Sequence, residues 1–278
     1  MMRRVPQQLQ AGALLIAFAE MTMLLRVQPF AIWNFPVLWW GYILTVDGLG
    51  EFFSARSMLK EHPGRIALMA LLSSGVWWVF EGLNVVVKNW HYVNVPDSIL
   101  AEVFFKSLAF STVIPAVFAT SWLLESLHLL EFAGRKRAAP STRAPQRVML
   151  LGIACFVLAA AVRTYFFWAI WLGFIFLLEP WNYLHGEPSM LQRYLAGDLG
   201  PIFRLMLAGL ICGIFWEFWN YWAYLKWQYT IPWLGFLKVF EMPVLGYLMY
   251  PLFALEVYAM YMYLTSLSPM LKRFRLEL

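Results

Sequence analysis

Two acid–amide pairs in this sequence have the residue types and spacing to do chemistry. Glu81 and Asn84 lie in one apolar stretch and Glu217 and Asn220 in another, both as Glu-x-x-Asn. Residues three apart share one face of a helix, so each copy presents a carboxyl group beside an amide. Ionisable groups are expensive within long apolar segments, and those that occur there often serve function. A desolvated carboxyl group can donate a proton to a substrate that water would not protonate.

Two further acids have a common context, because Asp47 and Glu179 each follow an isoleucine by four residues. Asp47 and Glu81 fall on successive helices, so we expect them to approach each other. The sequence therefore predicts Glu217, Glu81, Glu179 and Asp47 as candidate catalytic acids. A structural role remains open, because carboxyl and amide groups also join neighbouring helices by hydrogen bonds within membranes.

The acids lie among large aromatic side chains, in a chain with 15 Trp, 13 Tyr and 23 Phe. Aromatic faces stabilise cations by up to about 2 kcal/mol where water is excluded. An acid with aromatic walls therefore suits carbocation chemistry on an isoprenoid. The same walls would bind a polyene, quinone or sterol without chemistry, and packing or lipid contact also explains many aromatics. The predicted substrate-binding residues are Asn220, Asn84, Trp216, Trp219 and Trp78.

The composition is that of an integral membrane protein. The chain has 278 residues, of which 62% are hydrophobic and 13% charged, whereas soluble domains have about 25% charged residues. The net charge of +5 comes from basic residues in short segments beside the apolar runs, so we predict no nucleic-acid partner. The histidines lack metal-ligand spacing, and no metal or cofactor is predicted. We expect a membrane lipid or a lipid-soluble small molecule as partner; the oligomeric state is left open.

The apolar runs are long enough to give eight membrane-spanning helices, in an all-α fold. The run from 147 to 183 would be about 55 Å long as one helix, so we divide it near Arg163. A seven-span alternative keeps that run whole. We interpret the first run as a retained span rather than a signal peptide. The predicted spans are 9–26, 36–54, 66–88, 99–127, two within 147–183, 202–225 and 240–264.

The two halves of the chain repeat each other. With an offset of 136 residues, Glu81 and Asn84 fall on Glu217 and Asn220, and Trp-x-Tyr follows in both halves. We therefore predict a tandem duplication. The predicted parts are a first four-helix repeat at 1–130, a basic linker at 131–146, a second four-helix repeat at 147–268 and a basic tail at 269–278.

Four spans in each half give both repeats the same orientation, related by an axis along the membrane normal. The basic segments then all fall on the cytoplasmic side, as the positive-inside rule requires. We expect both termini to be cytoplasmic, in a bacterial or archaeal cytoplasmic membrane.

One stretch of the second half resembles a known family. Residues 227–235 (Trp-Gln-Tyr-Thr-Ile-Pro-Trp-Leu-Gly) and 241–243 (Glu-Met-Pro) are similar to the membrane lycopene-cyclase domain of carotenoid synthesis. That family is also built of small tandem helical repeats, with an upstream acid, a Trp-x-Tyr and acids after a proline. Here Val244 and Leu245 follow the proline, and the acid, Glu241, precedes it. The resemblance implies an isoprenoid substrate.

Three functions remain open on the sequence. The first is an enzyme that acts on a lipid-soluble isoprenoid or carotenoid-like substrate by intramembrane acid catalysis. The second is a transporter or lipid- or ion-binding protein whose midplane acids lie at the repeat interface. The third is a non-catalytic membrane subunit in which the buried polar groups only join helices.

Overall fold

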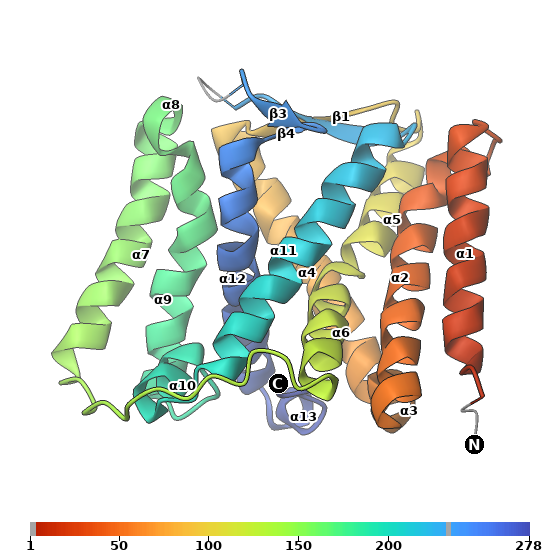
Figure 1. The fold of residues 1–278 in the computed structure, drawn as a ribbon. Coiled ribbons are helices and arrows are strands. Elements are labelled where there is room, and N and C mark those ends of the chain that lie inside the picture. The colour runs from red at the N-terminus through yellow and green to blue at the C-terminus, as the bar shows by residue number, and fades with distance from the viewer. Residues whose placement is uncertain (1–3, 232–234) are drawn as a thin grey trace.

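The protein is a bundle of long helices that run roughly parallel to one another, with short strands across one end (Figure 1). The structure, a computed structural model, describes residues 4–231 and 235–278. Three residues of the family-like stretch, Pro232, Trp233 and Leu234, lie outside the described residues. We call the end that carries the strands the strand end. The opposite end, where the described chain begins at Arg4 and where it ends, we call the linker end (Figure 1).

The elements of the first half are helices joined by short connections. They are α1 (Gln7–Leu24), α2 (Phe30–Ser54), α3 (Met58–Glu61), α4 (Pro63–Val87), β1 (Trp90–Val93), α5 (Ile99–Phe110) and α6 (Val113–Ser126).

The second half has a similar order of elements. They are α7 (Arg143–Ala161), α8 (Arg163–Phe166), the 3-10 helix η1 (Phe167–Ala169), α9 (Ile170–Leu184), α10 (Met190–Ala196), α11 (Gly200–Trp222), β2 (Lys226–Tyr229), β3 (Lys238–Val239), β4 (Met242–Pro243), the 3-10 helix η2 (Val244–Leu248), α12 (Met249–Ser266) and α13 (Pro269–Arg273).

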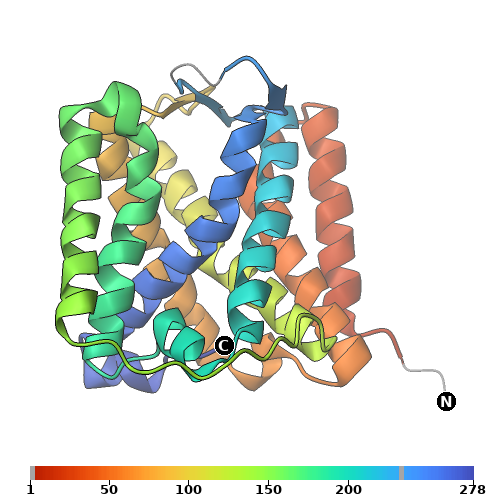
Figure 2. The ribbon, with the colours of Figure 1, turned by 60° about the vertical axis from the view of Figure 1, so that its left-hand side comes forward.

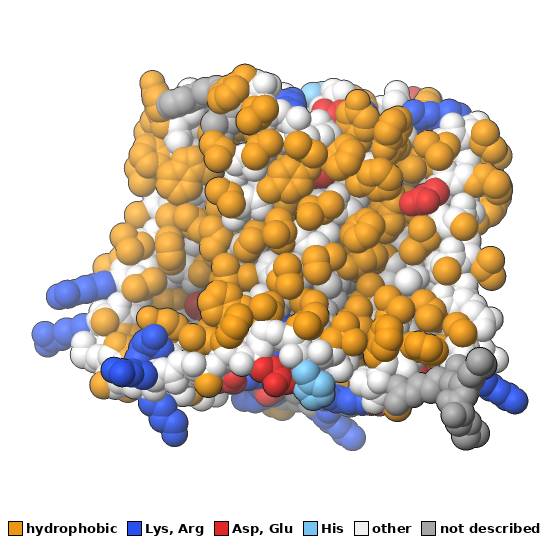
Figure 3. Space-filling view, viewed as in Figure 1, with side chains coloured by type: hydrophobic (Ala, Val, Ile, Leu, Met, Phe, Trp, Pro, Cys, Tyr) orange, Lys and Arg blue, Asp and Glu red, His pale blue; other side chains and the backbone are white. Residues whose placement is uncertain are grey.

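Within the described residues, six helical segments are long and apolar enough to cross a membrane. On the face shown in Figure 3 an apolar band covers them, and Lys and Arg gather at the linker end. The protein is therefore an integral membrane protein. Helices α1 and α2, of 18 and 25 residues, lie beside these segments in the same bundle. The six segments are Pro63–Val87, Ile99–Ser126, Arg143–Ala161, Arg163–Leu184, Gly200–Trp222 and Val244–Ser266.

The structure bears on two of the predicted boundaries between helices. The predicted division near Arg163 is confirmed, because α7 ends at Ala161 and α8 begins at Arg163. The predicted span 99–127 is broken into α5 and α6. At the break, Ser73 Oγ donates to the Phe110 carbonyl (2.6 Å) and accepts from the Ile114 amide (3.0 Å), so its hydroxyl serves backbone groups that the break leaves unpaired.

Close helix pairs are made by glycines that face each other. A Cβ added to Gly12 would lie 2.6 Å from the Gly41 carbonyl oxygen, so α1 and α2 touch through their backbones. In the second half, a Cβ on Gly152 would lie 2.8 Å from the Gly173 carbonyl oxygen, between α7 and α9. Small residues permit this close approach, on which packing in membranes depends.

Two strands from different halves form an antiparallel ladder across the strand end. Trp90 pairs with Tyr229, and Tyr92 pairs with Trp227. The Trp-x-Tyr segments of the two halves therefore lie side by side and run in opposite directions. The ladder joins the ends of α4 and α11, Val87 and Trp222, which lie 135 residues apart in the chain.

At the linker end, polar contacts hold the segments between the helices. The linker between α6 and α7 crosses this end of the bundle (Figure 1), and the Gly134 amide donates to the Gly197 carbonyl at 2.7 Å. The C-terminal segment is held by Glu187, which accepts from Lys272 at 2.7 Å and from Arg275 at 2.6 Å. Hydrogen bonds and ion pairs thus join segments at both ends of the bundle, and the apolar band lies between these ends.

Candidate functional site

The amides of the two Glu-x-x-Asn pairs each hold the start of a strand. Asn84 Oδ1 accepts from the Trp90 amide at 3.3 Å, and its Nδ2 donates to the Trp90 carbonyl at 2.8 Å. Asn220 makes the same two bonds to Trp227, both at 2.9 Å. Each asparagine thus turns the chain from the end of its helix into its strand. These two residues position the ladder.

The carboxyl groups accept hydrogen bonds from the side chains of the same strands. Glu81 Oε1 accepts from the Tyr92 hydroxyl at 2.7 Å, and Glu217 Oε1 accepts from the Tyr229 hydroxyl at 2.7 Å. One turn of helix therefore holds both the backbone and the tyrosine of its Trp-x-Tyr segment. The sequence analysis identified both the Glu-x-x-Asn and the Trp-x-Tyr motifs, but it did not predict that they contact each other.

The second partner of each carboxyl group differs between the halves. Glu81 Oε1 also accepts from the Trp90 indole at 3.0 Å, whereas Glu217 Oε1 accepts from the Tyr250 hydroxyl at 2.5 Å. Glu217 is fully buried, and its second oxygen has no hydrogen-bond partner among the described residues. Glu217 is thus a buried acid held by two phenols.

Tyr250 reaches Glu217 because Gly213 leaves space for its ring. A Cβ on Gly213 would lie 2.2 Å from Tyr250 Cγ. At the offset of 136, Gly213 corresponds to Trp77 and Tyr250 corresponds to Ile114. The aromatic ring therefore comes from α4 in the first half and from α12 in the second. The sequence analysis did not name Tyr250 or Gly213. This exchange of small and large residues was the signal that could have identified them.

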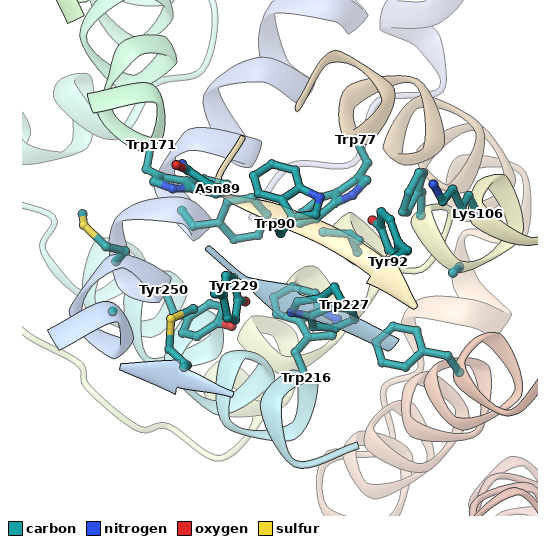
Figure 4. A pocket seen from close by; sticks show the side chains of 18 of the residues that line it. Trp77, Asn89, Trp90, Tyr92, Lys106, Trp171, Trp216, Trp227, Tyr229 and Tyr250 are labelled. Carbon is teal, nitrogen blue, oxygen red and sulfur yellow. The ribbon is translucent and has the colours of Figure 1, made fainter. Parts of the chain in front are cut away.

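A cavity of about 330 Å³ lies beneath the ladder, between the two halves. Aromatic side chains from both halves surround it: Figure 4 shows Trp90 and Tyr92 of β1, and Trp227 and Tyr229 of β2, around the same space. Both tyrosines and Tyr250 line the cavity, whereas neither Glu81 nor Glu217 does. The remaining labelled residues that line it are Trp77, Asn89, Lys106, Trp171 and Trp216.

Polar groups in the cavity wall come mainly from the first half. Lys106 forms an ion pair with Glu102 at 2.6 Å and lies 3.9 Å from the centre of the Tyr92 ring. Asn89 Oδ1 is buried and has no hydrogen-bond partner among the described residues. The cavity therefore combines an apolar aromatic wall with a few polar groups, as small-molecule sites usually do.

The phenol of Tyr229, in the strand outside the helices, is kept in its protonated form. Burial and then the neighbouring carboxyl of Glu217 raise its pKa well above the ordinary value. Tyr229 therefore donates to Glu217 at neutral pH. A carboxyl group with two phenols at its Oε1 can take up or release a proton while these donors compensate the charge.

Asp47 and Glu179 lie elsewhere. Asp47 Oδ1 accepts from the Leu59 amide at 3.2 Å, and Glu179 Oε2 accepts from the Leu191 amide at 3.1 Å. These contacts hold the short helices α3 and α10 at the linker end, far along the bundle from the ladder (Figure 1). The structure thus does not bring Asp47 near Glu81, and the catalytic role of Asp47 and Glu179 stays a prediction.

The three tryptophans predicted to bind substrate have different surroundings. Trp216 lines the cavity. Trp219 is buried against Trp39 and donates to Glu20 at 3.0 Å, and Trp78 donates to Ser107 at 3.0 Å. Neither Trp78 nor Trp219 lines the cavity, nor do Asn84 and Asn220. Within the predicted set, only Trp216 contacts the space that a ligand would occupy.

Within residues 4–231 and 235–278, no group of three or more His, Cys, Asp or Glu residues could hold a metal ion. Comparison with known proteins gave no match: no protein-family model, no curated protein and no solved structure matches this chain.

Proposed function

We propose that the protein is an intramembrane enzyme that protonates a lipid-soluble isoprenoid in the aromatic cavity, with Glu217 as the acid. The observation that carries the proposal is the placement of this acid. Glu217 is fully buried behind Tyr229 and Tyr250, and both of these hydroxyl-bearing side chains line the cavity. A proton can thus pass between the acid and the cavity through one phenol.

The proposed step is a proton relay through Tyr250. Tyr250 donates its phenolic proton to one carbon of a substrate double bond, and Glu217 gives its own proton to the Tyr250 oxygen. The π electrons form the new C–H bond and leave a carbocation on the other carbon. Loss of a proton from a neighbouring carbon, back through Tyr250 to Glu217, forms a new double bond. The result is an isomerisation or cyclisation that consumes no co-reactant.

The aromatic walls support the cationic intermediate. The rings of Trp216, Trp227 and Trp90 line the cavity, and an aromatic face attracts a desolvated cation by up to about 2 kcal/mol. The walls also exclude water, which would otherwise capture the carbocation. These two effects favour chemistry on an apolar polyene over chemistry on a polar substrate.

The wider arrangement that we propose is two parallel four-helix repeats with eight spans. Asn84 makes the same contact in the first half as Asn220 makes in the second, and the contacts of Glu81 and Glu217 with their tyrosines match in the same way. This agreement supports a tandem duplication. Because the described chain begins and ends at the end where the linker lies, we place that basic end in the cytoplasm. The resemblance to the membrane lycopene-cyclase domain supports the same substrate class.

The test begins with mass spectrometry and an absorbance spectrum of what co-purifies with the solubilised protein. A stoichiometric isoprenoid would identify the substrate for an assay. Glu217→Gln keeps an acceptor for both tyrosines but carries no transferable acid proton, so we expect normal folding with turnover reduced by about 10² or more. Glu81→Gln is the matched control and should retain turnover.

Other results would favour other functions. If both the wild type and Glu217→Gln bind an isoprenoid and neither converts it, the protein is a lipid-binding protein. Proton- or ion-coupled flux in liposomes would indicate a transporter. A lower unfolding temperature in Glu217→Gln as the sole effect would indicate that this acid only joins helices.

A further inference from the structure

We infer that the cavity opens sideways into the lipid, through a portal between η1 and η2 that admits an apolar isoprenoid chain from the bilayer. This inference rests on the proposed function, because it concerns how the ligand of that cavity arrives. We define the portal by Trp168 of η1 and Leu245 of η2.

The exposure of the cavity wall locates the opening. Among the described residues that line the cavity, Trp168 and Leu245 are the exposed ones, with 40% and 57% of their surface accessible. Both fall inside segments that are apolar enough to cross the membrane, Arg163–Leu184 and Val244–Ser266. The opening therefore faces the acyl chains near the strand end rather than water.

The helices on either side of the portal diverge towards it. Low in the bundle, α9 and α12 are joined by Asn182 Nδ2, which donates to the Ala259 carbonyl at 3.0 Å, and higher up the rings of Trp171 and Phe253 lie 5.8 Å apart. Towards the strand end α12, drawn in blue, leans away from α9 (Figure 2). The two helices thus form a V whose wide end is the portal.

The corresponding place in the first half is closed. At offsets of 132 and 136, Trp168 and Leu245 correspond to Pro36, which is buried, and Ala109, which is half-buried. Here the Trp33 ring of α2 packs on Phe105 of α5, with centroids 3.5 Å apart, and on Phe104 at 5.8 Å. These three rings fill the gap between α2 and α5. The ligand path is therefore one-sided, on the half that contains Glu217 and Tyr250.

The ligand class follows from the portal. Its defining residues are an indole and a leucine, so a charged headgroup would lose hydration without gaining an ion pair. An uncharged branched hydrocarbon chain gives up no hydration when it leaves the lipid for an aromatic cavity. The polar groups that such a chain meets, Asn89 and Lys106, lie inside the cavity wall. They suit a single hydroxyl or similar neutral group at the end of the chain.

The experiment measures how fast the cavity is loaded from a bilayer. Protein in phosphatidylcholine nanodiscs is mixed with vesicles containing a farnesol derivative that carries a photoactivated diazirine. Samples are irradiated at intervals, and mass spectrometry follows labelling of the peptide that contains Tyr250. Leu245→Trp narrows the portal. The matched control is Leu248→Trp, which alters a residue of the same 3-10 helix that is 67% exposed and does not line the cavity.

We expect Leu245→Trp to slow loading by about tenfold, equivalent to an added barrier of roughly 1.4 kcal/mol, while the final occupancy changes little. Leu248→Trp should load like the wild type. Trp168→Ala widens the portal and should speed loading, and it keeps the inference testable if Leu245→Trp folds poorly.

The outcomes separate the portal from the function. If the cavity is labelled in the wild type, and at the same rate in Leu245→Trp, Trp168→Ala and Leu248→Trp, the portal is overturned and the proposed function is left intact. Absence of cavity labelling in the wild type would overturn the proposed function, and the portal with it.

Discussion

Glu81 and Glu217 occupy equivalent helix positions, yet among the described residues only Glu217 has a hydrogen-bond partner from a distant helix. Its bond to Tyr250 depends on Gly213, since any larger residue there would occupy the space of the phenol ring. Glycine in a helix interior costs about 1 kcal/mol relative to alanine. Its presence opposite Tyr250 is thus explained by the space that the ring needs.

Replacing Gly213 by alanine should displace Tyr250 from Glu217. The added methyl group would lie 2.2 Å from the ring, and such overpacking costs about 1–3 kcal/mol. We expect lower thermal stability and loss of turnover. The control is Gly82→Ala, because nothing lies within 4 Å of the added Cβ, and its stability should be equal or higher. Normal turnover in Gly213→Ala would contradict the relay through Tyr250.

The sequence predicted some of these residues and not others, for a physical reason. Glu217 and Asn220 were recognisable because polar groups are rare in apolar helices. Tyr250 was not, since a tyrosine in a chain with 13 of them carries no signal until its neighbour is known. Hydrogen-bond partners 33 residues apart are set by the crossing of α11 and α12, which one sequence does not specify.

At the scale of elements, the two short helices at the linker end are held in the same way. Ser57 precedes α3 and Ser189 precedes α10, and each serine hydroxyl accepts from an amide three residues later, at 3.1 and 3.0 Å. The acid of the preceding long helix adds a second acceptor, Asp47 in one half and Glu179 in the other. These contacts satisfy amides that the start of a helix leaves unpaired.

Removal of Asp47 tests this capping role against the predicted catalytic one. In Asp47→Ala, the Leu59 amide and the hydroxyl of Ser57 lose their acceptor, and buried groups left without a partner cost about 1–3 kcal/mol each. We expect a clear loss of thermal stability. Asp47→Asn keeps an acceptor and should be less destabilised, with normal turnover. A stable Asp47→Asn variant without turnover would support the catalytic assignment instead.

The sequence also gave no sign of several elements. The predicted spans 66–88 and 202–225 match α4 and α11 closely, because long apolar runs are a strong signal. Strands β1 to β4 and the break before Ile114 were missed. Strands β1 and β2 and the break are held by contacts from distant parts of the chain, such as Ser73 at the break. Strands β3 and β4 pair with each other locally, but with two residues each they are too short to leave a pattern in the sequence.

For the whole molecule, the C-terminal segment depends on charge. Glu187 accepts from both Lys272 and Arg275. Partial burial of Glu187 acts to raise its pKa, but the hydrogen bonds and charges of Lys272 and Arg275 outweigh this and bring it below the ordinary value. A carboxyl group whose pKa is lower in the folded state stabilises the fold above its unfolded pKa. That contribution is lost as pH falls through the folded pKa.

We therefore expect the unfolding temperature of the wild type to exceed that of Glu187→Gln near neutral pH. The difference should shrink as the pH falls through the lowered pKa of the folded state, and it should be absent once the carboxyl group is protonated in both states. Thermal unfolding of both proteins from neutral to acidic pH checks the prediction. Glu277→Gln is the control, because Glu277 is exposed and, within the described part of the chain, forms an ion pair with Arg275 only. A pH-independent difference would mean that Glu187 acts through packing.

The ladder of β1 and β2 has a consequence for how such a chain could arise. Trp90 opposite Tyr229 and Tyr92 opposite Trp227 is the pairing that one segment would make with a second copy of itself. A half-length ancestor could therefore have assembled as a symmetric dimer, without any new surface. In a dimer of identical subunits, every mutation of the gene changes both subunits. On the duplication proposed above, fusion of their genes would let one half acquire Gly213 and Tyr250 while the other kept its gap filled by Trp33, so that the proposed site would belong to one half.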